Sequence, residues 1–267
     1  MSLDISSKDN AKIKYVKKLI TNGSFRKKEN SFVVEGLRLC YDAFLSKVEI
    51  KEVYYTDNIY EKFADKLKQI IGYSKKAYKV SEEILKGISD TKTPQGIVCV
   101  CAQLDKHFSV NTINNAGKFI ILENIQDPAN LGTILRTAEA LGLNFVVLSS
   151  DCCDMYNAKV LRASMGAVFR VQVLVAENLY DDIKRFKSLG AKVYAAVPEK
   201  EAKSVTEINL NNFSAIAVGN EGNGLTSELI ALCDEKITIP MLGRAESLNA
   251  AMAAGILMWE MMRDSRE

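Results

Sequence analysis

Apolar and polar positions follow two different periods along this chain of 267 residues. Within residues 9–22, apolar side chains recur at helical spacing and lysines lie on the other face, which predicts an amphipathic basic helix. Strand-like apolar runs and helical patterns alternate after it. The strands are expected at residues 32–36, 48–55 and 96–101, and the helices at residues 37–45 and 59–70. This pattern predicts a small α/β domain over residues 1–105.

A polar stretch from Asp105 to Gly117 interrupts both periods, and three asparagines within it break any amphipathic pattern. We interpret residues 106–117 as a linker. The chain after it, residues 118–267, forms a second domain. At 267 residues the chain is long enough for two domains with cores of their own.

The second domain reads as continuous apolar strands separated by helices, which favours a parallel sheet covered on both faces. The strands are expected at residues 119–122, 145–148, 169–175, 193–197, 215–218 and 237–239. The helices are expected at residues 131–141, 158–165, 179–189, 225–232 and 247–262. Ligands of such sheets bind beyond the carboxyl ends of the strands, so the loops that leave those ends are where chemistry is expected.

The amino-acid composition of the chain disfavours several classes of function. No apolar run is long enough to cross a bilayer and the first residues are polar, so we expect a cytoplasmic protein without a membrane partner. The single histidine, His107, lies in the linker, which disfavours zinc hydrolases and serine triads and predicts no metal. No cysteine pair has Cys-x-x-Cys spacing, and we interpret the six as reduced core residues: Cys40, Cys99, Cys101, Cys152, Cys153 and Cys233.

Charge is spread unevenly although the formal net charge is only +2. Residues 1–106 hold 20 Lys and Arg against 14 Asp and Glu, whereas the remainder holds 15 against 19. The basic excess lies within residues 1–28, at Lys8, Lys12, Lys14, Lys17, Lys18, Arg26, Lys27 and Lys28. This cluster is a candidate phosphate-binding surface for RNA, and the alternative is an ordinary solvated helix face.

Three loops of the second domain carry candidate chemistry. The first follows the strand at residues 119–122 and runs through Pro128 and Asn130 into a helix that holds Arg136, about one and two-thirds turns beyond Asn130. A carboxamide and a guanidinium then share one crevice. The alternative is a helix cap followed by a surface arginine.

The second loop, residues 219–224, contains three glycines, which let a backbone approach a ligand closely and present its amides. It lacks the dinucleotide spacing of glycines, and a turn without any ligand is the alternative. The third, residues 239–255, leads from a strand into a helix rich in Ala and Gly that we expect to begin near Ser247. Small residues there allow close approach of another backbone, and the alternative is an ordinary core helix with Ser247 as its cap.

Together, residues 123–138, 218–225 and 239–255 resemble the three motifs of the SpoU (TrmH) branch of the SPOUT RNA methyltransferases. Residues 159–167 also look like that family. The basic start and the run Phe32 to Gly36 resemble, more loosely, the L30e-type substrate-binding domain that often precedes it.

The resemblance implies an α/β fold with a parallel sheet and a deep trefoil knot, S-adenosylmethionine (SAM) as cofactor, and a homodimer. By motif position, it implies these catalytic residues: Asn130, Arg136, Glu221, Ser247 and Asn249. It implies cofactor contacts at Val218, Gly219, Asn220, Gly222, Ile239, Met241, Ser247, Leu248 and Asn249.

The function that the resemblance implies is methyl transfer to a ribose 2′-OH of structured RNA. The first expectation for the substrate is 23S ribosomal RNA, because the front domain resembles those of the ribosomal enzymes, and transfer RNA is the second. Two alternatives remain open at this point: a non-catalytic RNA-binding or ribosome-assembly protein that keeps the fold, and an enzyme that methylates a base nitrogen.

Overall fold

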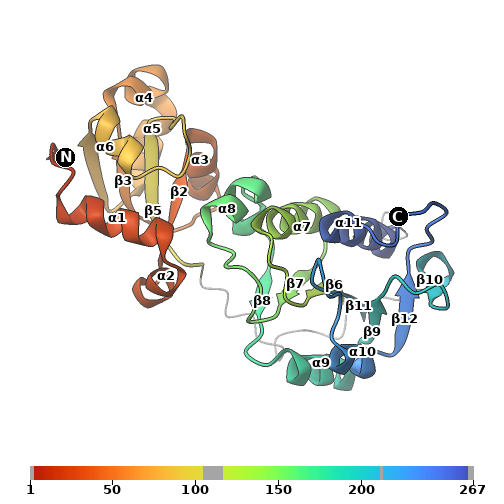
Figure 1. Ribbon diagram of the computed structural model, residues 1–267. Coiled ribbons are helices and arrows are strands. Elements are labelled where there is room, and N and C mark those ends of the chain that lie inside the picture. Colours follow the sequence, from red (N-terminus) through yellow and green to blue (C-terminus); the bar gives the residue numbers. More distant parts are fainter. Residues whose placement is uncertain (1–2, 105–116, 211–212, 264–267) are drawn as a thin grey trace. The chain divides into compact units, whose positions relative to one another are not determined.

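The structure is a computed structural model that describes residues 3–104, 117–210 and 213–263. In these residues the chain forms two compact units, coloured along the sequence in Figure 1. The first holds residues 3–104 together with Tyr156–Phe169, and the second holds residues 117–155 and 170–263. The predicted linker and its His107 lie outside the described residues, apart from Gly117, which begins a strand.

The first unit is built on a five-stranded sheet in the order β1–β4–β3–β5–β2. Its strands are β1 (Leu3–Ile5), β2 (Ser31–Glu35), β3 (Ile50–Tyr55), β4 (Lys76–Val80) and β5 (Ile97–Ala102). β5 runs antiparallel to both of its neighbours, and the other pairs are parallel. The sequence analysis missed β1 and β4, because both are short and their pairing across the sheet, rather than their pattern, makes them strands.

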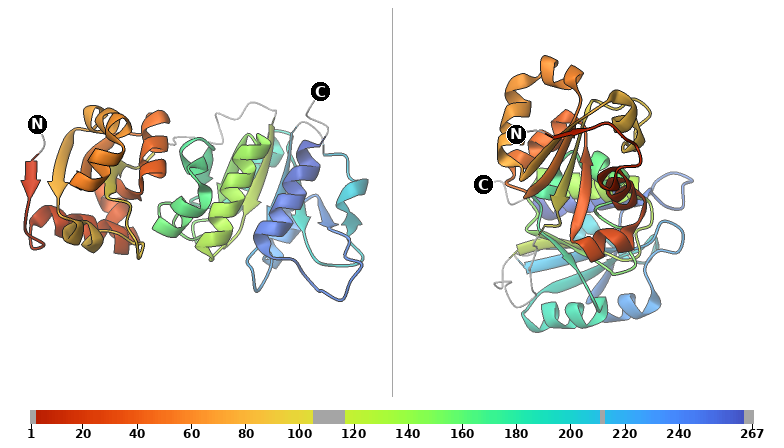
Figure 2. Two further views of the ribbon diagram at one scale, coloured as in Figure 1. Left: turned by 90° about the horizontal axis from the view of Figure 1, so that it is seen from above. Right: turned by 90° about the vertical axis from the view of Figure 1, so that its left-hand side faces the viewer.

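Helices cover both faces of this sheet (Figures 1 and 2). They are α1 (Ala11–Thr21), α2 (Gly23–Glu29), α3 (Leu37–Leu45), α4 (Asp57–Lys62), α5 (Ala64–Tyr73) and α6 (Glu82–Gly87). α1 and α6 pack on one face around Ile13, Val16 and Leu85, whereas α3 and α5 lie on the other. The predicted helix 59–70 is two helices, because Phe63 between them has an extended φ of −136°.

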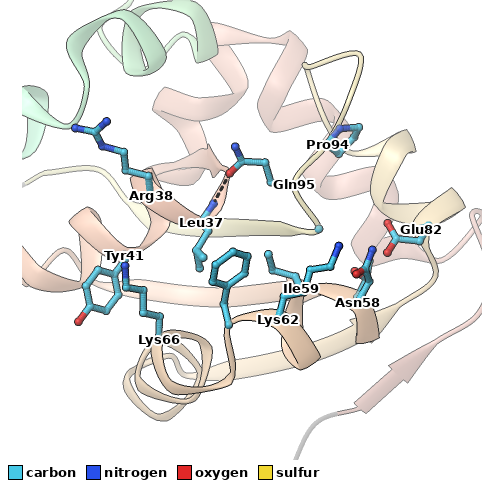
Figure 3. Close-up of a pocket in the computed structure, with 13 residues that line it drawn as sticks. Leu37, Arg38, Tyr41, Asn58, Ile59, Lys62, Lys66, Glu82, Pro94 and Gln95 are labelled. Atoms are coloured by element: carbon cyan, nitrogen blue, oxygen red, sulfur yellow. Dashed lines mark hydrogen bonds between the residues drawn. The ribbon is translucent and has the colours of Figure 1, made fainter.

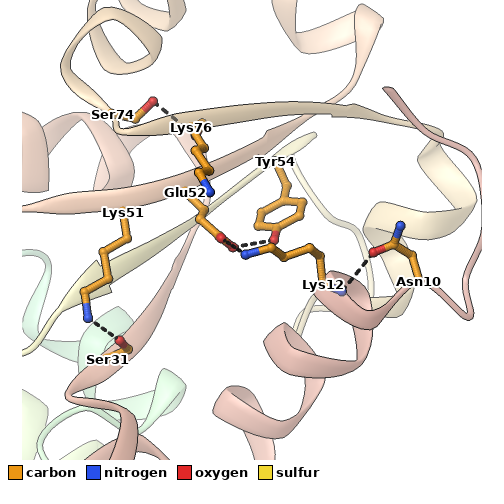
Figure 4. Close-up of polar contacts among 8 residues, drawn as sticks. All are labelled: Asn10, Lys12, Ser31, Lys51, Glu52, Tyr54, Ser74 and Lys76. Carbon is orange, nitrogen blue, oxygen red and sulfur yellow. Dashed lines mark hydrogen bonds and ion pairs between the residues drawn. The ribbon is translucent and has the colours of Figure 1, made fainter. Parts of the chain in front are cut away.

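A buried carboxylate ties α1 to the sheet (Figure 4). Glu52 of β3 is 7% exposed, accepts a hydrogen bond from Lys12 Nζ, and accepts another from Tyr54 Oη at 2.6 Å. Burial alone would lower the pKa of Lys12, but the hydrogen bond and the charge of Glu52 outweigh it and raise that pKa. Lys12 therefore remains charged and acts inside the unit as a link between helix and strand.

Residues 156–169, which the sequence analysis assigned to the second domain, pack with the first unit. They contain α8 (Ala158–Ser164) and the short 3-10 helix η2 (Ala167–Phe169). The ring of Tyr156 lies 4.6 Å from that of Phe32 in β2, and Arg162 pairs with Asp90 at 2.7 Å. Residues 156–169 thus contribute apolar and charged contacts to the first unit, although they follow the predicted linker in sequence.

The second unit is built on a seven-stranded sheet in the order β10–β12–β9–β11–β6–β7–β8, and every pairing in it is parallel. Its strands are β6 (Gly117–Leu122), β7 (Phe145–Leu148), β8 (Val173–Val175), β9 (Lys192–Ala196), β10 (Lys203–Ser204), β11 (Phe213–Val218) and β12 (Glu235–Thr238). The predicted parallel α/β sheet is confirmed. β8 is shorter than predicted, because the run that begins at Phe169 starts as the end of η2.

Two helices cover each face of this sheet (Figure 1). The helices are α7 (Pro128–Leu141), α9 (Leu179–Ser188), α10 (Ser227–Leu232) and α11 (Ala250–Met262), and a 3-10 helix, η3 (Val205–Glu207), follows β10. α7 and α11 pack side by side on one face, and a Cβ built on Gly255 of α11 would lie 3.9 Å from Thr137 Cγ2 of α7. The Ala- and Gly-rich helix therefore packs against α7, but a methyl group at Gly255 would make only an ordinary contact there, so the close backbone approach stays a prediction. No helix in the described part of the chain is long and apolar enough to span a membrane.

One residue of the predicted RNA-binding surface is buried in α2. Arg26 is only 5% exposed, and its guanidinium donates hydrogen bonds to the main-chain oxygens of Leu19 at 2.7 Å and Ile20 at 3.0 Å. A cation at these orphan carbonyls stabilises the end of α1. The prediction that Arg26 offers a surface contact to RNA is therefore wrong.

We expect Arg26→Gln to lower the free energy of unfolding by about 2 kcal/mol, because buried carbonyls lose a charged donor. Lys27→Gln, at the exposed neighbouring position, is the matched control and should leave stability unchanged. Urea unfolding followed by circular dichroism measures both. Equal effects of the two substitutions would contradict a capping role for Arg26.

Candidate active site

The three loops singled out in the sequence leave the same edge of the parallel sheet. β12, β9, β11 and β6 are consecutive neighbours and all run in the same direction, so their carboxyl ends lie together. Loop 123–127 follows β6, loop 219–224 follows β11, and loop 239–249 follows β12. This edge is where ligands of open parallel sheets bind.

One buried carboxamide joins all three loops. Asn130, in the first turn of α7, is 7% exposed and donates from Nδ2 to Glu221 Oε1 at 2.9 Å. Its Oδ1 accepts a hydrogen bond from Asn249 Nδ2 at 3.0 Å. Three of the five predicted catalytic residues, separated by 91 and 119 positions in sequence, thus form one chain of contacts.

Glu221 is held by more than this contact. The backbone amides of Gln126 and Asp127 also donate to its carboxylate, at 3.3 and 3.2 Å. Burial alone would raise the pKa of Glu221, but the hydrogen bonds from Asn130 and from these amides outweigh it and keep the pKa below its ordinary value. Glu221 is therefore an anion at neutral pH that fixes the glycine-rich loop against the start of α7.

The glycine-rich loop is a tight reversal. Asn220 and Gly224 exchange backbone hydrogen bonds at 3.0 Å, and Asn220 Oδ1 accepts from the amides of Gly222 and Asn223 at 2.9 and 3.1 Å. A Cβ on Gly219 would lie 2.1 Å from the backbone carbon of Gly224, which no side chain tolerates. The missing side chain of Gly219 thus lets the backbone of Gly224, in the same loop, approach closely. The backbone at Gly222 is exposed, and Val218 is the buried last residue of β11.

Sequence reasoning quoted Glu123 in the first motif but gave it no role. The structure shows it to be an anchor: it is 4% exposed and accepts hydrogen bonds from the amide and the hydroxyl of Thr226, both at 2.8 Å. Asn124, with a positive φ of 54°, offers its carbonyl to Asn220 Nδ2 at 2.8 Å. A carboxylate and an asparagine directly after a buried strand were the signal that could have indicated this role.

The third loop is open and its helix begins later than predicted. The N-cap of α11 is Asn249, whose Oδ1 accepts from the amides of Ala251 and Met252 at 2.9 and 3.2 Å. Ser247 lies exposed two residues earlier, so the alternative interpretation of Ser247 as the helix cap is wrong, and its role in the site stays a prediction. Asparagine is as good an N-cap as serine, which is why the pattern alone chose incorrectly.

The open loop fits a ligand that is recognised by backbone groups. Among the described residues, the amides of residues 241–248 donate no hydrogen bond. Ile239 and Met241 are partly buried and Leu248 is 39% exposed, so apolar side chains accompany the unused polar backbone. An adenosine with an amino-acid tail requires this combination of apolar contact and hydrogen bonding.

Arg136 is placed differently from the other predicted residues. It lies on the exposed side of α7 and makes no hydrogen bond or ion pair with any described residue. The structure joins Asn130, Glu221 and Asn249 directly, but it does not bring Arg136 or Ser247 into contact with them. A free guanidinium on the helix that carries Asn130 is available for an anionic ligand.

A cavity of about 560 Å³ borders the glycine-rich loop and is lined in part by Asn220, Glu123, Asp151 and Glu177. Its acidic lining disfavours RNA, and none of the five predicted catalytic residues lines it. In the part of the chain that the structure describes, no group of three or more His, Cys, Asp or Glu side chains could hold a metal ion.

The predicted basic surface of the first unit is less available than the sequence indicated. Lys8 pairs with Glu83, Lys12 with Glu52 and Lys14 with Asp9, and Arg26 is buried. Lys18 lies 4.4 Å over the ring of Phe25. Lys17, Lys27 and Lys28 remain exposed without an ion-pair partner among the described residues. RNA contact at these lysines stays a prediction.

Comparison with known proteins agrees with this geometry. Residues 117–259 match the SpoU rRNA Methylase family, and residues 10–99 match the MRM3-like substrate binding domain. The chain is 35% identical, over 96% of its length and 98% of the relative, to the 23S rRNA (guanosine(2553)-2′-O)-methyltransferase RlmP of Bacillus subtilis.

Solved structures show the same relationship. The AdoMet-bound rRNA methyltransferase from Sinorhizobium meliloti superposes with a TM-score of 0.85 at 29% identity, covering 97% of both chains. A structure described as giving insights into 2-OH methylation of C/U34 on tRNA covers only 57% of this chain, and 97% of its own, with a TM-score of 0.52 at 26% identity. With three loops joined at one sheet edge and more than half of its length matched, the chain belongs to the SpoU rRNA methylase family.

Proposed function

We propose that this protein transfers a methyl group from SAM to a ribose 2′-OH of 23S ribosomal RNA. The observation that carries the proposal is the contact of Asn130 with both Glu221 and Asn249, because it assembles three distant motifs into one polar site. The relative from Bacillus subtilis, which matches nearly the whole chain, is named as a 23S rRNA 2′-O-methyltransferase. A non-catalytic role is disfavoured because the site residues are present and ordered.

SAM fits the open edge beside the glycine-rich loop. The residues that would hold it are the unpaired backbone of residues 241–248, the exposed Gly222, and the apolar Ile239, Met241 and Leu248. When bound, SAM supplies a methyl group made electrophilic by a positively charged sulfur. Protein groups need only align the acceptor and manage one proton, because the leaving group is already activated.

Arg136 is the residue proposed to act on the acceptor. A guanidinium stays protonated in proteins and is a poor proton acceptor, so Arg136 orients the ribose and stabilises the developing alkoxide. With SAM and RNA bound, the ribose oxygen would take the methyl group from the sulfur, and the hydroxyl proton would pass to an RNA phosphate or to water. Asn130, whose amide nitrogen and oxygen are both hydrogen-bonded, holds the three loops in fixed positions relative to one another.

Transfer RNA is the second candidate substrate. The tRNA-related structure lacks a counterpart for much of this chain, whereas the ribosomal relatives match the front domain as well. This coverage favours ribosomal RNA. Methylation of a base nitrogen is the remaining alternative, and mass spectrometry of the modified nucleoside separates it from ribose methylation.

A homodimer is also part of the proposal. α11 carries Met252, Ile256 and Trp259 at helical spacing on one stripe, and they are 61%, 38% and 48% exposed. An exposed apolar stripe of this kind marks an interface. The stripe starts next to Asn249, so a second copy of the chain on it would lie close to the proposed site. The trefoil knot and a cytoplasmic location remain predictions.

We expect Arg136→Lys to lower turnover on the order of 100-fold while SAM affinity barely changes, because lysine cannot reproduce the planar, forked contact to the alkoxide. Transfer of tritium from labelled SAM to a 23S rRNA transcript, followed by nucleoside mass spectrometry, measures the first. Calorimetric titration with SAM measures the second.

Arg170→Lys is the matched control, because Arg170 makes a surface ion pair with Glu139 at 2.8 Å and should tolerate the change. Full turnover in Arg136→Lys would refute the role given to Arg136. Incorporation by the unaltered protein into tRNA alone, into a base nitrogen, or into no RNA would refute the proposed function.

We expect Met252→Glu to convert a dimer into a monomer, since a buried charge without a partner is costly in an interface. Light scattering coupled to size exclusion gives the mass directly. Val175→Glu is the control, because Val175 is 52% exposed at the end of the sheet opposite β10. A monomeric unaltered protein, or a dimer that survives Met252→Glu, would contradict the interface.

A further inference from the structure

The first unit contains a cavity of about 680 Å³ that the sequence did not indicate (Figure 3). It lies beyond the carboxyl ends of β2, β3 and β4: Leu37 and Arg38 follow β2, Thr56 and Asn58 follow β3, and Glu82 follows β4. Segment 94–96, which leads into the antiparallel β5, closes one wall. This position obeys the same rule that places ligands at parallel strand ends, and the volume suits a small organic ligand.

Gly96 lines this cavity, and Gly36 directly precedes the lining residue Leu37. Gly36 and Gly96 have φ values of +90° and +89°, which side chains other than glycine rarely adopt. A Cβ on Gly96 would lie 2.9 Å from Ile59 Cβ and from Thr56 Oγ1. Gln95 crosses from the opposite segment and accepts a hydrogen bond from the amide of Leu37 at 3.1 Å, as Figure 3 shows. The backbone conformation of these glycines and the Gln95 contact therefore fix the shape of the cavity.

The lining combines cations, aromatic rings and carboxamides. Arg38, Lys62 and Lys66 face only one carboxylate of the lining, Glu82, and neither Arg38 nor Lys62 has an ion-pair partner among the described residues. Phe63 is 47% exposed, and Lys66 Nζ lies 5.1 Å over the ring of Tyr41. In Figure 3, Tyr41 and Lys66 lie at one end of the cavity and Asn58 and Glu82 at the other.

Polar groups of the lining are also available for hydrogen bonds. In the described part of the chain, the amide nitrogens of Asn58 and Gln95 have no hydrogen-bond partner. Rings for stacking, amides for a base edge and cations for a phosphate are the groups that bind an unpaired nucleotide. An RNA duplex cannot present its stacked bases to such a cavity.

We propose that this cavity holds one unpaired nucleotide of the RNA substrate, with the base against Phe63 and a phosphate on Lys62. The inference rests on the proposed function for its RNA, and it names how the first unit selects that RNA. The contrast with the predicted basic helix supports it, because three of the lysines there are ion-paired and Arg26 is buried, whereas two of the cavity's cations are unpaired.

The test measures binding of the full chain to a labelled ten-nucleotide single-stranded RNA of mixed sequence, by fluorescence anisotropy at several salt concentrations. We expect Phe63→Ala to weaken binding about tenfold with an unchanged salt slope, because stacking is lost. Lys62→Gln should also weaken binding and reduce the slope by about 0.7, because one phosphate contact is lost. If Phe63 and Lys62 acted only in folding, both substitutions would change the salt dependence of binding in the same way.

Matched controls lie on α5 outside the cavity lining. Lys68→Gln and Tyr73→Ala remove an exposed lysine and a 41% exposed ring, and both should bind as the unaltered chain does. SAM affinity should be the same in all four variants, which verifies that the second unit is intact.

The inference is overturned if the cavity variants bind the single strand normally, if the controls lose as much affinity, or if a duplex of equal length binds as well. Competition by polyglutamate as effective as that by RNA would also overturn it, in favour of an acidic protein partner. Methylation is scored separately. If the unaltered chain methylates no RNA but Phe63→Ala and Lys62→Gln show the expected losses, the proposed function fails and the nucleotide site stands.

Discussion

The structure of the catalytic unit depends on one buried carboxamide whose two ends are both used. Asn130 donates to Glu221 and accepts from Asn249, so a single side chain sets the distance between a helix start, a glycine-rich turn and the cap of α11. Asn130 itself is buried, where an unpaired amide would cost about 1–3 kcal/mol, and each loop is therefore held by the others. Lys118 adds a second constraint, because its buried ammonium donates to the carbonyl of Met261 near the end of α11.

Much of the fold could be predicted from periodicity, and the misses have physical causes. The strands β6, β7 and β11 of the second unit were predicted correctly because they are buried on both faces, so that their apolar runs are continuous. The two-residue β10 was missed, because it is too short to show a pattern. β4 was missed because it is short and two of its five residues are lysines, which resembles a solvated loop until β1 and β3 pair with it. The sequence analysis placed segment 156–169 in the second domain, because no local pattern indicates that the ring of Tyr156 packs against that of Phe32.

The sequence predicted the residues of the site better than it predicted the hydrogen bonds between them. Motif order identified Asn130, Glu221 and Asn249, but no sequence pattern shows that one amide joins them or that Glu123 anchors Thr226. Charge counting was a weaker guide. It selected the lysines of α1 and could not show that Glu52 and Glu83 neutralise two of them, whereas the cations of the first unit's cavity are scattered along the sequence and converge only through the sheet.

The central claim is that Asn130 and Asn249 act as one unit, and a double-mutant cycle tests it most directly. The quantity to measure is kcat/KM for methyl transfer to a 23S rRNA transcript by Asn130→Ala, Asn249→Ala and the double variant. The account predicts strong coupling: the double variant loses little more activity than the more damaging single variant, because either change breaks the same contact. Additive losses in the double variant would contradict it, since the two side chains would then act independently.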